Sequence, residues 1–247
     1  MVGRFISIII ILPLIICASC TSSKKIAYFE NAQDSAYRVV LGTIEAPIQK
    51  NDILNITISS LSPKDDVEYN RTDNTTKGYL VNTDGTVQLP KLGNIMAAGL
   101  TKKQLTESIT NILLAKKELL NPVVEIRHLN FEVTVLGEVT NPTVINVPSE
   151  KISLIKALGL AGDLTIFGKR DNVLLIREED GKRITRHLDI NSPEFLNSPY
   201  YYLKPNDVVY VEPNKAKVAT TNRSNQVIPF IFSGISILIL VLDRVIK

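Results

Sequence analysis

The stretch of the chain that decides the fold runs from Asp84 to Gly93 and reads DGTVQLPKLG. The segment GLTKKQL follows from Gly99 to Leu105, and NPVVEI follows from Asn121 to Ile126. Turn residues, an apolar alternation, a helix-capping pattern and a second apolar run come in that order. The order turn, strand, capped helix and strand predicts a small α+β domain.

Local signals place the elements of this domain. Asp84-Gly85 predicts a hairpin turn, with 79–81 and 87–89 as its two arms and Pro90 ending the second arm. Thr101 and Gln104 have the spacing of a capping box, which predicts a helix from about Lys102 to Leu119. Asn121-Pro122 then stops the helix before the next strand.

The flanks of this stretch predict one more strand and a loop. Apolar residues alternate with polar ones over 53–59, which predicts a strand. Residues 62–77 are polar and predict a surface loop without a packing face. The alternative for this loop is an oligomer rim or a partner contact.

A second unit begins at Phe131, where apolar and polar residues alternate up to Val135. A helix is predicted from about Lys151 to Leu160, and Ala161-Gly162 ends it. Three further strands are predicted, over 173–177, 184–190 and 208–211.

The N-terminus has the layout of a secretory signal peptide. Arg4 precedes an apolar run over 5–16, and the small residues Ala18 and Ser19 precede Cys20. Polar residues 21–25 follow and predict a flexible tether. The alternative is an uncleaved N-terminal membrane anchor.

The C-terminus is strongly apolar. Residues 227–242 carry no charge, which predicts a transmembrane helix. Ser233, Ser236 and Asp243 fall close to one helical stripe with Gly234 beside it, and such residues allow helices to approach one another in lipid. The stripe is compatible with a ring of packed helices, and a single tail anchor is the alternative.

The order and spacing of these motifs resemble polysaccharide export proteins of the outer membrane (Wza-like proteins). The resemblance implies a mixed export domain followed by one β-grasp domain of the SLBB type. Two local departures are Thr143, which follows Pro142, and Asp163, which follows Gly162, because the family commonly has glycine at both positions. The resulting division is a lipoprotein signal peptide 1–19, a lipidated tether 20–43, an export domain 44–128, an SLBB domain 129–213, a linker 214–226 and a transmembrane helix 227–247.

The same resemblance implies a function. Cys20 would receive a lipid, and the chain would form a homo-oligomeric ring, often an octamer, that passes capsular or exopolysaccharide through the outer membrane. An inner-membrane polysaccharide co-polymerase would be its partner. The alternative is a tail-anchored periplasmic module that binds a glycan or small ligand and forms no pore.

Composition argues against other classes of function. Among 247 residues, 28 Lys and Arg face 25 Asp and Glu, a net charge of +3 that is too small to indicate nucleic-acid binding. Cys17 and Cys20 are the two cysteines, so the predicted domains have no disulfide. His128 and His187 are far apart, and no phosphate loop or nucleophile elbow is present. We therefore expect no metal, no cofactor and no catalysis, against the alternative of a polysaccharide-modifying enzyme.

Overall fold

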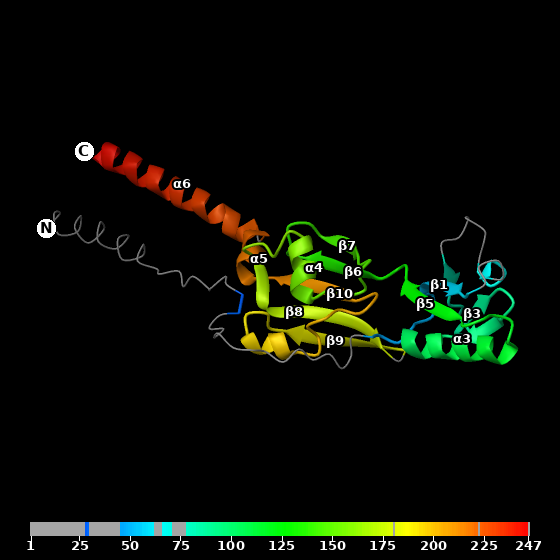
Figure 1. The fold of residues 1–247 in the computed structure, drawn as a ribbon. Coiled ribbons are helices and arrows are strands. Elements are labelled where there is room, and N and C mark those ends of the chain that lie inside the picture. The colour runs from blue at the N-terminus through cyan, green and yellow to red at the C-terminus, as the bar shows by residue number, and fades with distance from the viewer. Residues whose placement is uncertain are drawn as a thin grey trace.

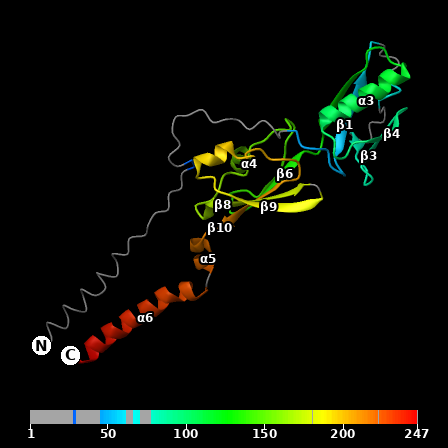
Figure 2. The same ribbon diagram turned by 90° about the horizontal axis from the view of Figure 1, so that it is seen from below.

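The computed structural model describes residues 28–29, 45–61, 66–70, 78–179, 181–221 and 223–246. Two domains follow one another along an elongated molecule, and a long helix projects from the end of the second domain (Figures 1 and 2). Each domain has its own cluster of buried apolar side chains. The predicted signal peptide and Cys20 lie outside the described residues.

The first domain combines a three-stranded sheet, a hairpin and one helix. The strand order is β2-β1-β5, and both neighbours of β1 are antiparallel to it. Leu54, Ile56 and Ile58 of β1 are buried while the residues between them are more exposed, so one face of the sheet meets the core. The elements are β1 (Ile53–Ser59), β2 (Tyr79–Leu80), β3 (Thr86–Leu89), β4 (Gly93–Met96), α3 (Lys102–Lys116) and β5 (Val123–His128).

Helix α3 begins with the predicted capping box. The Thr101 hydroxyl accepts from the Gln104 N–H at 3.2 Å, and the Gln104 side chain accepts from the Thr101 N–H at 2.8 Å. The helix ends at Lys116 rather than Leu119, because Lys117 adopts a left-handed conformation with φ 56°. The Lys117 N–H closes the last turn on the carbonyls of the preceding turn.

The predicted hairpin across Asp84-Gly85 is confirmed at its tip, but its paired arms are shorter than predicted. Gly85 has a φ of 88°, the Asn82 N–H donates to the Thr86 carbonyl at 2.8 Å, and among the described residues one bridge, Val81 to Val87, joins the two arms. Strand β2 pairs with β1, and strand β3 pairs with β4 in a register that brings Leu89 opposite Gly93. The strands therefore diverge after the turn, each toward a different partner.

The prediction of a loop without a packing face is also wrong for its described part. Tyr69 is 1% exposed and belongs to the core of the first domain. Nearby, the Asn70 side-chain oxygen accepts from the Ile58 N–H at 2.9 Å, and the Asp66 carboxylate accepts from the Ser60 N–H at 2.9 Å. Residues 66–70 thus cover the end of β1.

The second domain is a five-stranded sheet with helices packed against it, in the strand order β7-β6-β10-β8-β9. The last strand, β10, lies in the middle, parallel to β6 and antiparallel to β8. Helix α4 begins at Leu154 rather than Lys151, because the Ser153 hydroxyl caps it by accepting from the Lys156 N–H at 3.1 Å. The elements are β6 (Glu132–Gly137), β7 (Thr143–Asn146), α4 (Leu154–Leu160), β8 (Gly168–Glu179), β9 (Lys182–Leu188), the 3-10 helix η1 (Pro193–Asn197) and β10 (Val208–Pro213).

Beyond β10 the chain forms α5 (Lys215–Thr221) and α6 (Arg223–Ile246). The α+β class is confirmed, but the predicted C-terminal transmembrane helix is wrong: in the described part of the chain, no helix combines the length and hydropathy that a bilayer crossing requires. The uncharged stretch 227–242 has sixteen residues. At 1.5 Å per residue it reaches about 24 Å, short of the ~30 Å hydrocarbon core.

Candidate functional site at the junction of the two domains

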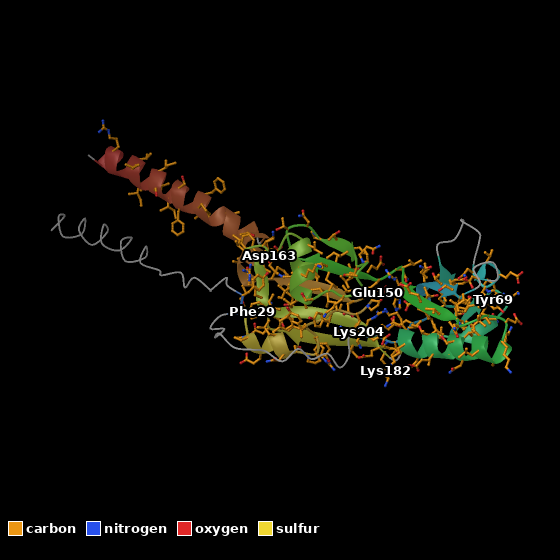
Figure 3. The ribbon with its side chains drawn as sticks, viewed as in Figure 1. Phe29, Tyr69, Glu150, Asp163, Lys182 and Lys204 are labelled. Atoms are coloured by element: carbon orange, nitrogen blue, oxygen red, sulfur yellow. The ribbon has the colours of Figure 1, made fainter. Side chains whose placement is uncertain are left out.

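A cavity of about 370 Å³ lies where the two domains meet. The first domain contributes Lys102, at the start of α3, and His128, at the end of β5. The second domain contributes Glu150, between β7 and α4, and Lys204, in the segment before β10. Figure 3 shows Glu150 and Lys204 at this junction. Ala46, Phe131, Leu203 and Pro205 add apolar surface beside these polar and charged side chains.

Glu150 joins the two domains. One carboxylate oxygen accepts from the backbone N–H of His128 at 2.8 Å, and the other forms an ion pair with the Lys102 ammonium. The Glu150 and Lys102 side chains are 15% and 26% exposed, so water screens this pair less than a surface pair. Glu150 itself has a φ of 54°. This left-handed conformation is unfavourable for residues that carry a side chain.

A buried histidine and a buried aspartate lie behind this contact. The His128 and Asp52 side chains are 5% and 2% exposed, and Nδ1 of the histidine lies 3.6 Å from a carboxylate oxygen of the aspartate. That distance is too long for a hydrogen bond, and His128 Nδ1 has no hydrogen-bond partner among the described residues. Burial lowers the pKa of His128 and raises the pKa of Asp52. Burial therefore favours the neutral form of each group.

The other lysines of the cavity are engaged within the second domain. Lys204 Nζ lies 2.5 Å from a carboxylate oxygen of Glu179, which lowers the pKa of that carboxyl group. Lys151 Nζ lies 4.5 Å from the centre of the Tyr202 ring. The positive charges at the junction are thus met by acidic or aromatic partners. This arrangement is suited to holding the two domains together.

The segment that carries Lys204 is fixed by a fully buried ion pair. Arg177 Nε and Nη2 donate to the two carboxylate oxygens of Asp207 at 2.9 and 2.7 Å, and the two side chains are 4% and 0% exposed. Asp207 also accepts from the Lys204 N–H at 2.7 Å. The pair therefore ties strand β8 to the turn before β10, which forms one wall of the cavity.

The residues predicted for a pore lie elsewhere. Ser233, Gly234, Ser236 and Asp243 are on α6, and the Ser236 hydroxyl donates to the Phe232 carbonyl of its own helix at 2.9 Å. Their role between packed helices stays a prediction. Cys20 is outside the described residues, so its lipidation also stays a prediction.

Comparison with known proteins matches both domains. The family described as polysaccharide biosynthesis/export protein matches residues 43–129, and the SLBB domain family matches residues 133–186. The chain is 28% identical over 159 residues to the EPS I polysaccharide export outer membrane protein EpsA of Ralstonia solanacearum. It is 29% identical over 160 residues to the protein of the same name in Ralstonia nicotianae. Each match covers 62% of this chain and 41% of the relative.

Proposed function

The chain belongs to the polysaccharide biosynthesis/export protein family, and on that premise we propose that it exports an extracellular or capsular polysaccharide across the outer membrane. The observation that carries this proposal is the succession of an export domain and an SLBB domain in one chain, matched over adjacent segments. The proteins of this family are transport proteins rather than enzymes, in agreement with the prediction that this chain is not an enzyme.

The assembly we propose is a homo-oligomer whose wall is built from both domains. The contacts of Glu150 support it, because subunits can form a regular ring only if their two domains keep a defined relative orientation. The exposed apolar surface of α6 supports it too. Phe230, Phe232 and Leu240 are 77%, 66% and 71% exposed in the single chain, and large apolar surfaces of this kind mark contact sites.

Two further partners belong to the proposal. Cys20 would carry the lipid that holds the protein at the outer membrane, since several acyl chains at ~0.8 kcal/mol per buried CH₂ give firm attachment. An inner-membrane polysaccharide co-polymerase would deliver the polymer. The polysaccharide would make weak, polar contacts, because a conduit must release what it carries.

Export is tested in cells that lack the chain. We expect surface polysaccharide to be lost on deletion, to accumulate inside the cell, and to return with the intact chain. Cys20→Ala should abolish incorporation of labelled fatty acid and reduce surface polysaccharide, whereas the matched control Cys17→Ala should do neither. Unchanged surface polysaccharide after deletion would refute the export function.

Assembly is tested separately by light scattering of the full chain in mild detergent. A mass that is a whole multiple of the chain mass supports the homo-oligomer. A monodisperse monomer at all concentrations would refute self-assembly without bearing on whether the protein is needed for export.

A further inference from the structure

Two residues near the N-terminus pack against the second domain although the first domain follows them in sequence. Tyr28 and Phe29 contact the buried cluster of the second domain, and their rings lie 6.2 Å apart. Figure 3 shows Phe29 and Asp163 at the end of this domain that is remote from the junction. Following the chain from the N-terminus, the described residues thus contact the second domain before the first domain begins.

The Tyr28 side chain lies between an acidic and a basic residue. Its hydroxyl donates to a carboxylate oxygen of Asp163, and the Arg170 guanidinium carbon lies 5.5 Å from the centre of its ring. Arg170 is 8% exposed, and its Nε has no hydrogen-bond partner within the part of the chain that the structure describes. A buried guanidinium facing a ring gains a cation–π interaction that water screens little.

Asp163 presents its carboxylate from a left-handed backbone position. It has a φ of 66°, a conformation that glycine adopts freely and that aspartate tolerates better than most residues. The same carboxylate oxygen accepts from the Leu164 N–H at 2.6 Å, which fixes the side chain beside Tyr28. Glycine would satisfy the backbone here, but it would offer no acceptor to a phenol.

The site adjoins the start of the C-terminal helices. Four residues after Asp163, the carbonyl of Phe167 accepts from the Asn214 N–H at 2.7 Å, immediately before α5. Lys217 of α5 lies over the Phe167 ring at 5.3 Å and forms an ion pair with Glu138 at 3.4 Å. One turn of the second domain therefore contacts both Tyr28 and the base of α5.

We propose that Asp163 and Arg170 form a docking site for the Tyr28 side chain. This contact, called the clasp below, attaches the N-terminal segment to the second domain. The consequence for the membrane rests on the proposed lipidation of Cys20. Eight peptide bonds lead from Cys20 to Tyr28, and they reach at most about 29 Å. Without the clasp, the tether runs from Cys20 to Glu45 at the first domain and reaches about 90 Å. The clasp therefore keeps the lipid close to the end from which α5 and α6 emerge.

Chymotrypsin tests the clasp with the native residues, because it cleaves after aromatic side chains that enter its own pocket. In the purified full chain, cleavage after Tyr28 and Phe29 should be slow. Asp163→Gly keeps the left-handed backbone and removes the acceptor, so cleavage there should become at least threefold faster. Asn121→Gly, at a φ of 50° in the first domain, is the matched control and should leave the rate unchanged. Equal rates in all three proteins would overturn the proposal.

Fluorescence gives a second, independent measurement, since the chain contains no tryptophan. Tyr28→Trp introduces one indole whose N–H can donate to Asp163. Its emission should be blue-shifted relative to the urea-unfolded chain, and acrylamide should quench it less. Adding Asp163→Gly should raise the quenching constant at least twofold, and adding Asn121→Gly should not. A fully exposed tryptophan in the folded protein would also overturn the proposal. Neither experiment involves lipid or polysaccharide, so a failed export assay would leave both results standing.

Discussion

Replacing Glu150 measures how firmly the two domains are joined. Glu150→Gln keeps an acceptor for the His128 N–H and removes the charge that faces Lys102, so we expect a loss of about 1 kcal/mol from this partly buried pair. Glu150→Gly removes both contacts and leaves a buried N–H without its acceptor, which costs about 1–3 kcal/mol. Glycine also relieves the left-handed backbone at φ 54°, so part of this loss is recovered.

Amide hydrogen exchange at His128 reports on this contact directly. Because about 1.4 kcal/mol corresponds to a factor of ten, His128 exchange should be severalfold faster in Glu150→Gln and ten- to a hundredfold faster in Glu150→Gly. Amides in the middle of α3 and of β10 should change little, since both domains keep their own cores. Unchanged His128 exchange in Glu150→Gly would refute the reasoning that this carboxylate holds the junction closed.

Three further predictions concern stability, measured by urea unfolding with domain-resolved hydrogen exchange. Lys117→Gly should stabilise the first domain by up to about 1 kcal/mol, because Lys117 ends α3 in a left-handed conformation; a loss of stability would contradict this. Arg177→Met should destabilise the second domain by about 3–5 kcal/mol, because it leaves the Asp207 charge buried without its partner. Adding Asp207→Asn should restore most of the lost stability. A loss below about 1 kcal/mol in Arg177→Met would show that water reaches the pair. Burial lowers the pKa of His128, so the unfolded chain takes up a proton near pH 6.5 before the folded chain does. The free energy of unfolding of the first domain should therefore fall as the pH drops from about 7.5 to 5.5, by at most about 1.4 kcal/mol per pH unit. His128→Gln should flatten this dependence on pH. An equal dependence on pH in both proteins would contradict the assignment to His128.

Local signals in the sequence predicted the local structure well. Thr101 and Gln104 predicted the start of α3 to the residue, because a capping box requires only neighbours within one turn. The pairing around Asp84-Gly85 could not be predicted in this way, since a turn fixes the direction of the chain but not the partner of each strand. Tyr69 was missed because one aromatic residue in a polar segment gives no periodic signal.

The junction could not be predicted from the sequence. Glu150 and Lys102 are far apart in the chain, and both are residue types that are common on protein surfaces. Asp52 precedes a strand and His128 ends another, so only the antiparallel pairing of β1 with β5 brings them together. The uncharged stretch 227–242 predicted a transmembrane helix that the described helices do not provide, because sixteen residues without charge are fewer than the about 20 that a crossing requires.

The position of β10 has a consequence for the order in which the molecule is made. The described strands of the first domain are all made once β5 has been synthesised. In the second domain, β10 lies between β6 and β8, so Thr134 of β6, which pairs with Val144 of β7, gains its second neighbour only when Val208 has been made. A chain that emerges N-terminus first therefore has a folded first domain before its second domain is complete. Until β10 is made, the β6–β7 and β8–β9 pairs each have an unpaired strand edge. Nascent chains that stop before Val208 are expected to aggregate through these edges, and those that stop after Pro213 are not.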